Sequence, residues 1–174
     1  AITTAQAYGI KFEDMQKSLS KFCGAKRRFE FKKTIAPNVE LYDDYAHHPT
    51  EIKATLAAAK QKEHNKIIAA FQPHTFSRTK ELLTDFSHAF KDADVVLLMD
   101  IYAAREKDDG TVSSRDIEKL INKEKEKAIY TQNLEKTAQK IKEIIEPGDI
   151  VLSIGAGTIT HLADYFDDIN EKKD

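Results

Sequence analysis

Short apolar runs alternate with amphipathic segments along most of the chain. Residues 66–71, 95–99 and 150–154 are almost continuously apolar, whereas the segments between them repeat apolar side chains at helical spacing. The runs predict buried strands, and the spaced pattern predicts helices. We predict strands at residues 28–34, 39–44, 66–71, 95–99, 128–130 and 150–154. We predict helices at residues 1–24, 49–62, 77–91, 113–123 and 133–145, and a last helix that ends near residue 166.

The order of these elements predicts a three-layer αβα domain of the Rossmann-like class. Strands that alternate with helices form a mostly parallel sheet with helices on both faces and right-handed crossovers. The first two strands differ, because only residues 35–38, with Pro37 and Asn38, separate them. So short a connection joins antiparallel neighbours. We therefore expect a six-stranded, mostly parallel sheet in which the first strand is antiparallel.

Composition and charge exclude several function classes. The 174 residues include 27 Lys and Arg against 29 Asp and Glu, and the net charge of -2 lacks the basic excess of nucleic-acid-binding proteins. The single cysteine, Cys23, leaves no internal disulfide and fits a reducing cytoplasm. No apolar run approaches the ~20 residues of a membrane span, and no signal peptide opens the chain. We expect a cytoplasmic protein with no nucleic-acid or membrane partner.

Polar residues of site-like kinds follow most of the predicted strands. Strand beginnings carry ordinary solvated charge, as at residues 124–127, whereas the strand ends carry carboxylates, imidazoles and glycines. The carboxyl ends of parallel strands meet at one edge of a sheet, where open α/β folds bind their ligands. We predict one functional rim, formed by residues 43–48, 72–74, 100–102 and 155–157.

Simpler structural roles remain open for several of these residues. Asp43 or Asp44 alone could cap a helix or a turn. His47, His48 and His74 lack the spacing of a metal site, and we expect no metal there. Residues 26–28 could be either a solvated basic stretch or a phosphate clamp.

Two glycine-based nucleotide motifs are incomplete or missing. Gly155-Ala156-Gly157 has only the first two glycines of a dinucleotide fingerprint, and it closes the fold where that fingerprint usually opens one. Alone, it predicts a tight turn. No G-x-x-x-x-G-K-[ST] loop occurs, so the chain has no triphosphate cradle of its own.

Two stretches, residues 43–51 and 71–79, resemble the Mur ligases of bacterial peptidoglycan synthesis. They read Asp-Asp-Tyr-Ala-His-His-Pro-Thr-Glu and Phe-Gln-Pro-His-Thr-Phe-Ser-Arg-Thr. Residues 24–29, 100–104 and 155–157 extend the resemblance over nearly the whole chain. The resemblance implies the last of three domains, the one that presents the amino acid and closes over ATP. It implies that residues 1–24 are the helical tail of the central, ATP-binding domain and that residues 25–174 are the C-terminal domain.

The implied reaction is ATP-dependent amide formation between UDP-N-acetylmuramate and L-alanine, with Mg²⁺ ligands mainly outside this chain. By position in the motif, Arg28 resembles the arginine that reaches an ATP phosphate, Asp44 the carboxylate that holds the ribose, and Tyr45 a residue beside the nucleotide. No residue of this segment is assigned as catalytic. The implied partners are the N-terminal and central domains of the same enzyme.

His47, His74 and Arg78 resemble the residues that surround the incoming L-alanine in this family. Some family members carry a second arginine where this chain has Thr75, which puts a two-arginine carboxylate clamp in doubt. The structural alternative for Arg78 is an exposed helix arginine paired with Glu81 or Asp85.

Two other functions remain open. The related ligase that recycles muropeptides shares the first motif, although residues 74–79 resemble the alanine-adding branch more closely. A receiver-like or bare nucleotide-binding module is the alternative from another class. A receiver domain, however, needs a lysine at the end of its last strand, where this chain has Gly155.

Overall fold

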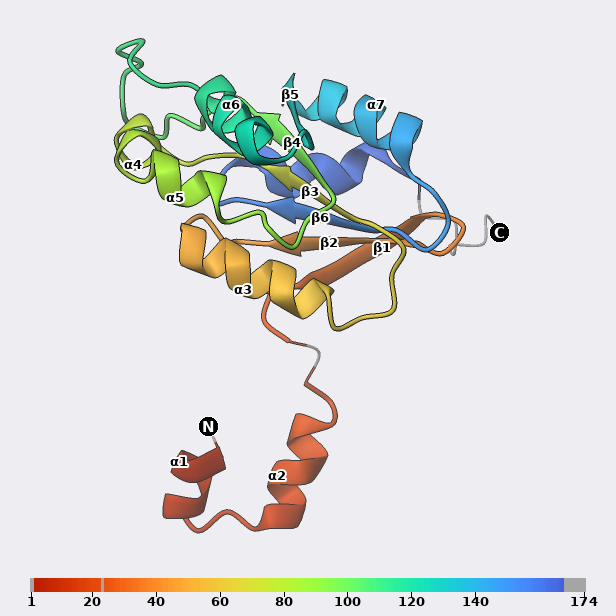
Figure 1. Ribbon diagram of the computed structural model, residues 1–174. Helices are drawn as coiled ribbons and strands as arrows, with labels where there is room; N and C mark the ends of the chain where they lie inside the picture. Colours follow the sequence, from red (N-terminus) through yellow and green to blue (C-terminus); the bar gives the residue numbers. More distant parts are fainter. Residues whose placement is uncertain (1, 23, 168–174) are drawn as a thin grey trace.

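Six strands form a single sheet in the order β1-β2-β6-β3-β4-β5 (Figure 1). The computed structural model describes residues 2–22 and 24–167, so Cys23 lies outside the described residues. The strands are β1 (Glu30–Ala36), β2 (Val39–Asp44), β3 (Ile67–Phe71), β4 (Val95–Met99), β5 (Ala128–Gln132) and β6 (Ile150–Ile154). The helices are α1 (Ile2–Ala7), α2 (Phe12–Leu19), α3 (Pro49–Ala59), α4 (Phe76–Glu81), α5 (Leu83–Ser87), α6 (Ser114–Glu124), α7 (Leu134–Ile144) and the 3-10 helix η1 (Thr158–Tyr165).

The strand directions confirm the predicted fold class. β2, β6, β3, β4 and β5 run parallel to their neighbours, whereas β1 is antiparallel to β2. β1 extends to Ala36, two residues further than predicted, so that only Pro37 and Asn38 form the turn. Asn38 has a φ of 57°, a left-handed conformation that asparagine tolerates better than most residues.

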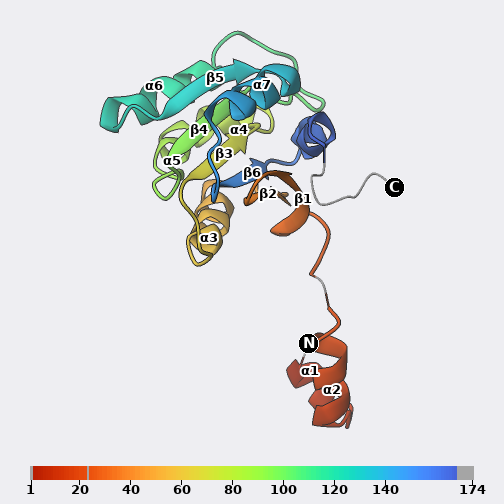
Figure 2. The ribbon, with the colours of Figure 1, turned by 90° about the vertical axis from the view of Figure 1, so that its right-hand side faces the viewer.

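Helices cover both faces of the sheet, which gives the predicted three layers. α3, α5 and α6 pack on one face around Leu56, Phe86 and Ile117, and α7 and η1 pack on the other around Ile141 and Leu162 (Figures 1 and 2). β3 and β6 are buried along their whole length between these layers. A sheet covered on both faces explains why its central strands are continuously apolar.

Two of the predicted helices differ in the structure. The helix predicted at residues 77–91 is two short helices, α4 and α5, because Leu82 lies outside the helical region with a φ of -102° and a ψ of 19°. The last helix, predicted to end near residue 166, is the 3-10 helix η1. Apolar spacing alone does not distinguish these cases, because a broken helix and a 3-10 turn place apolar side chains at nearly the same intervals.

The predicted N-terminal helix is also interrupted. α1 and α2 are separated by a turn in which Gly9 has a φ of 74°. Both helices lie apart from the sheet in the two views (Figures 1 and 2), and Phe12 is 61% exposed. No described helix is long and apolar enough to cross a membrane.

Candidate functional site

The ends of four neighbouring strands are joined by backbone hydrogen bonds beyond the strands themselves. The Gly155 N–H donates to the Asp44 carbonyl (3.1 Å), which links the ends of β6 and β2. The Tyr102 N–H donates to the Pro73 carbonyl (2.8 Å), and the Thr75 N–H donates to the Tyr102 carbonyl (2.9 Å). The segments that leave β2, β6, β3 and β4 therefore form one continuous rim, as the sequence predicts.

A row of aromatic rings runs along this rim. The ring centroids of Tyr45 and His47 are 5.3 Å apart, those of His47 and His74 6.0 Å, and those of His74 and Tyr102 5.6 Å. The rings come from the ends of β2, β3 and β4, so residues far apart in sequence share one surface. The structure thus brings together Tyr45, His47 and His74, which the sequence analysis selected separately.

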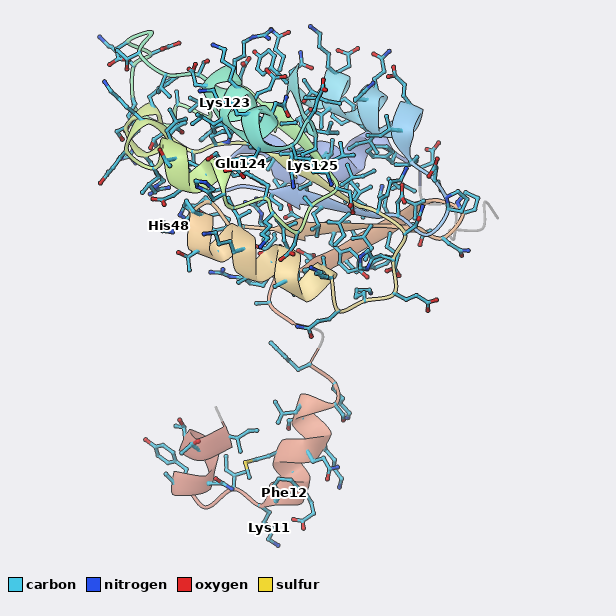
Figure 3. The ribbon with its side chains drawn as sticks, in the orientation of Figure 1. Lys11, Phe12, His48, Lys123, Glu124 and Lys125 are labelled. Carbon is cyan, nitrogen blue, oxygen red and sulfur yellow. The ribbon has the colours of Figure 1, made fainter. Side chains whose placement is uncertain are left out.

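The neighbouring imidazoles His47 and His48 have different surroundings. His48 lies at the start of α3 (Figure 3), where its Nδ1 accepts the Thr50 N–H (3.3 Å). Glu51 Oε2 accepts the N–H groups of His47 (3.0 Å) and His48 (3.2 Å), so these residues cap α3. His47 Nδ1 lies 3.0 Å from the Tyr45 carbonyl, and a neutral ring that donates there leaves Nε2 as an acceptor. His48 is therefore a structural cap, whereas His47 keeps one ring nitrogen for a ligand.

His74 and Arg78 carry polar atoms that are buried without a partner. His74 Nδ1 and Arg78 Nη1 have no hydrogen-bond partner among the described residues. The structural alternative for Arg78 is not seen, because no ion pair with Glu81 or Asp85 forms in the described part of the chain. Buried polar groups are rarely left unpaired in native proteins. The two side chains are therefore the candidates at this rim for holding an anionic group.

Burial and positive charge act on His74 in the same direction. The pKa of His74 lies below its ordinary value of 6.5, first because of burial, then because of the charge of Arg78 and that of His47. The nearby Glu106 carboxylate opposes this shift and does not cancel it. At neutral pH the ring is therefore uncharged, and the positive charge at this point of the rim comes from Arg78.

We predict that His74 titrates below pH 6.5 in this chain. The native state then binds fewer protons than the unfolded state, so His74 contributes stability above pH ~6.5 that is lost as the pH falls through its folded pKa. Proton NMR titration of the imidazole Cε1–H signals measures the midpoint, and a His74→Gln variant assigns the signal. A midpoint for His74 at or above 6.5 contradicts the predicted environment.

Asp44 is occupied by the protein's own backbone. Its Oδ2 accepts the Phe29 N–H (2.8 Å), its Oδ1 accepts the Ala46 N–H (2.8 Å), and the residue is only 6% exposed. The turn-capping role left open in the sequence analysis is therefore present. Each carboxylate oxygen keeps a second lone pair, and a ligand hydroxyl that approaches Asp44 has to use it.

Arg28 and Tyr45, by contrast, face solvent. Tyr45 is 39% exposed, and Arg28 is exposed, with no hydrogen bond or ion pair of its side chain in the described residues. Arg28 acts electrostatically on Glu51 at the start of α3, beside the rim. A free guanidinium and an exposed ring are therefore present where the resemblance places the nucleotide.

Two structural features of the site were not predicted. The basic residue that pairs with the rim is Arg27, whose Nε donates to Asp43 Oδ2 (2.9 Å). Gln72, which is 5% exposed, accepts the Ile159 N–H through Oε1 (3.0 Å) and so holds the start of η1. The sequence signal for the Arg27–Asp43 pair was that both the arginines and the aspartates are doubled. Nothing in the local pattern indicated the role of Gln72.

The glycines after β6 allow a close approach of side chains. A Cβ at Gly157 lies 2.8 Å from Tyr102 Cγ and overlaps Gln72 Oε1, so no larger residue fits without displacing them. Gly155 has a φ of 148° and a Cβ there lies 2.8 Å from the Gln72 carbonyl oxygen. Close packing at the rim therefore explains why residues 155 and 157 are glycines.

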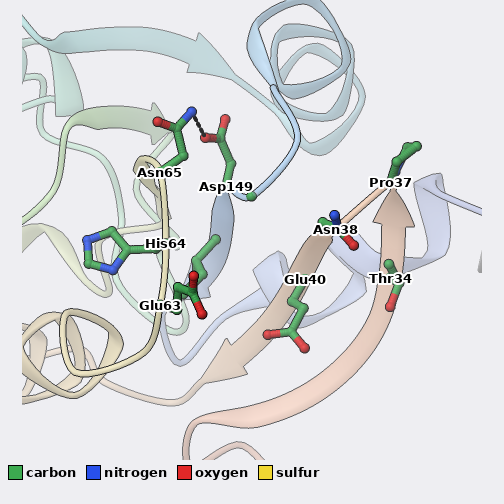
Figure 4. Close-up of a pocket in the computed structure, with 10 residues that line it drawn as sticks. Thr34, Pro37, Asn38, Glu40, Glu63, His64, Asn65 and Asp149 are labelled. Carbon is green, nitrogen blue, oxygen red and sulfur yellow. Dashed lines mark hydrogen bonds between the residues drawn. The ribbon is translucent and has the colours of Figure 1, made fainter.

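A hollow lies at the opposite edge of the sheet from the rim (Figure 4). It has a volume of about 860 Å³ and contains Asp149, which is 1% exposed. Asp149 accepts N–H groups from Asn65 (3.1 Å), Lys66 (3.1 Å) and Glu146 (2.9 Å). Because its buried carboxylate is fully paired, this hollow is a depression between loops and a weaker candidate than the rim.

No metal site accompanies the rim. Within residues 2–22 and 24–167, no group of three or more His, Cys, Asp and Glu side chains is arranged to hold an ion. His47, His48 and His74, the trio weighed in the sequence analysis, include one imidazole that caps a helix. The candidate site is therefore a rim of aromatic rings and cations.

Comparison with known proteins identifies the family. The sequence profile of the family "Mur ligase, glutamate ligase domain" matches residues 27–157. The chain belongs to the Mur ligase family. The match covers all six residues selected at the rim, Arg28, Asp44, Tyr45, His47, His74 and Arg78. It confirms the predicted family and shows that the receiver-like alternative was wrong.

Individual Mur ligases are similar to nearly the whole chain. The UDP-N-acetylmuramate–L-alanine ligase of Caldanaerobacter subterraneus is 48% identical over 94% of this chain and 35% of its own length. The chain thus spans about a third of the length of the curated relatives it matches. The crystal structure of the UDP-N-acetylmuramate-alanine ligase of Thermotoga maritima has a TM-score of 0.77 at 25% identity, covering 95% of this chain and 34% of that chain. The crystal structure of the MurF ligase of Thermotoga maritima in complex with ADP has a TM-score of 0.69 at 18% identity, covering 95% of this chain and 35% of that chain. At this identity the similarity shows only that the two chains share a fold.

Proposed function

We propose that this chain is the amino-acid-presenting, ATP-closing part of a ligase that joins L-alanine to UDP-N-acetylmuramate. The observation that carries the proposal is that His74 Nδ1 and Arg78 Nη1, two buried atoms, have no hydrogen-bond partner among the described residues. In this reaction the muramate carboxylate takes the γ-phosphoryl group of ATP, and the amine of L-alanine attacks the acyl phosphate. Such chemistry depends mainly on positioning and charge stabilisation.

The alanine end of the site needs donors for a carboxylate and an acceptor for an amine. Arg78 supplies a guanidinium, whose planar fork matches the two oxygens of a carboxylate. His74 supplies a second buried polar atom next to it, and His47 Nε2 is the acceptor for an amine proton. Thr75, whose φ is 66° and whose hydroxyl lies 3.5 Å from that of Ser77, adds no cation. Arg78 is therefore the one cation that this proposal assigns to the carboxylate.

The nucleotide end of the site is assigned to Arg28, Asp44 and Tyr45. Arg28 and Tyr45 fit ATP, since both are exposed and the Arg28 guanidinium has no hydrogen bond or ion pair among the described residues. Asp44 fits less well, because both of its oxygens already accept backbone N–H groups. The described residues hold no cluster for Mg²⁺, so its ligands belong to the preceding domain in this proposal.

The proposal divides the chain at about residue 24. Residues 1–24 are assigned to the tail of the central domain and residues 25–174 to the C-terminal domain. Supporting this division, α1 and α2 pack on each other away from the sheet and leave large apolar side chains exposed (Figure 1). The most exposed of these are Tyr8, Phe12 and Phe22. The proposed substrates, ATP and a UDP sugar, place the reaction in the cytoplasm.

A reconstitution experiment tests the proposed function. We expect the purified chain to fold and to form no amide, because the phosphate cradle and the UDP-sugar site are not part of it. Joined to the two N-terminal domains, it is expected to release phosphate from ATP only when UDP-N-acetylmuramate and L-alanine are both present. Ligation by the chain alone overturns the domain assignment, and an active three-domain enzyme that prefers a tripeptide to L-alanine overturns the substrate.

A further inference from the structure

Arg28 lies between two residues with an unusual backbone conformation. Arg27 has a φ of 55° and Phe29 a φ of 48°, although neither is glycine, asparagine or aspartate. Left-handed conformations are uncommon for such side chains and persist only where the surrounding structure holds them. Two of them in three residues, on either side of an exposed arginine, indicate that the direction of the Arg28 side chain is imposed by its neighbours.

Two consecutive carboxylates hold these two residues. Asp43, which is fully buried, accepts the Nε–H of Arg27 (2.9 Å), and the same guanidinium donates to the Gly155 carbonyl (2.6 Å). Asp44 accepts the N–H of Phe29 (2.8 Å). The turn at residues 27–29 is therefore fixed to the ends of β2 and β6, two adjacent strands of the rim.

Arg27 also contacts the exposed aromatic ring at the nucleotide end. Its carbonyl accepts the Tyr45 N–H (2.8 Å), and its guanidinium carbon lies 4.8 Å from the centroid of the Tyr45 ring. The first contact fixes the backbone of Tyr45 and the second packs a cation on the ring. Arg27 thus contacts the ends of β2 and β6 and also Tyr45.

We propose that Arg27 is a positioning residue for ATP. Its fork, held by Asp43 and by the Gly155 carbonyl, fixes the left-handed turn so that Arg28 projects over the rim and the Tyr45 ring keeps one orientation. The proposal rests on the proposed function, because it needs Arg28 and Tyr45 to face the nucleotide. Arg27 itself is paired inside the protein, and its effect on the reaction passes through these two neighbours.

Arg27→Lys in the three-domain enzyme tests this role. Lysine keeps the charge and the pairing with Asp43, but as a point charge it cannot also bond the Gly155 carbonyl in the plane of a fork. We expect KM for ATP to rise about tenfold while KM for L-alanine stays within about twofold. An effect of this size is typical of the interaction energy between residues in contact, here Arg27 with its neighbours. A purely structural role lowers the amount of active enzyme and therefore kcat, with both KM values unchanged.

A double variant shows whether Arg27 acts through Arg28. In the Arg28→Ala background, Arg27→Lys is expected to cause a smaller rise in KM for ATP than in the wild-type enzyme, because only its effect through Tyr45 remains. In this chain alone, Arg27→Lys should also speed hydrogen exchange of the Tyr45 N–H, measured by NMR, because the acceptor carbonyl is no longer held in place. Effects that multiply in the double variant, or an Arg27→Lys enzyme with unchanged KM for ATP, overturn the positioning role. Arg28→Ala with unchanged KM for ATP overturns the proposed nucleotide site instead.

Discussion

Arg78→Lys is expected to raise KM for L-alanine at least about tenfold, equivalent to ~1.4 kcal/mol, and to change KM for ATP much less. The guanidinium has a buried Nη1 atom with no partner among the described residues, next to the equally unpartnered His74 Nδ1. A carboxylate satisfies both groups at once. Lysine keeps the charge but loses the planar fork, and Thr75 supplies no second cation to compensate.

The measurement is steady-state kinetics on the three-domain enzyme, with L-alanine and ATP varied separately. Lys80→Arg is the matched control, since it makes the reverse exchange on the same helix at an exposed side chain that bonds only Thr111. The control is expected to keep both KM values. Wild-type dependence on L-alanine in the Arg78→Lys enzyme removes Arg78 from the site and leaves the carboxylate to His47 and His74.

The fold and the meeting of the selected strand ends at one rim could be predicted because they depend on patterns local in sequence. Continuous apolar runs are required of strands buried between two helical layers, and a two-residue turn can only join antiparallel strands. The breaks at Gly9 and Leu82 could not be predicted in this way. They depend on single backbone conformations that hardly change the spacing of apolar side chains.

Prediction of the site was limited by contacts between distant residues. Arg27 and the Gly155 carbonyl are 128 positions apart, and no periodicity links them. The selection of Arg28 as a ligand residue stays a prediction, but its neighbour Arg27 makes the internal ion pair, so the two arginines differ in role. His48 was grouped with His47 by sequence alone, whereas the start of α3 uses it as a cap. Each of these two pairs of adjacent like residues thus contains one member with a structural role, Arg27 in the first and His48 in the second.

Asp43→Ala is expected to lower the free energy of unfolding of this chain by about 2–4 kcal/mol. The Asp43 carboxylate is fully buried and accepts from Arg27 (2.9 Å), Ser153 (2.8 Å) and Thr160 (3.0 Å). Its loss removes the acceptor of the Arg27 Nε–H and of the Thr160 hydroxyl, and it leaves the Ser153 hydroxyl only the Tyr42 carbonyl (3.2 Å). The Arg27 side chain is 24% exposed, so water recovers part of its hydration, and the expected loss is below that of a wholly buried ion pair.

Urea denaturation of the 174-residue chain measures this effect without the other domains. Asp92→Ala is the control, because Asp92 pairs with Lys60 at a similar distance (2.8 Å) but on the surface, where the loss should stay below about 1 kcal/mol. An Asp43→Ala variant as stable as the control shows that the turn at residues 27–29 is held by other contacts. Asp43→Asn should lie between the two, because the amide keeps one acceptor oxygen for Ser153 while it removes the charge that holds Arg27. The difference between the Asn and Ala variants therefore separates the loss of the ion pair from the loss of the buried acceptor.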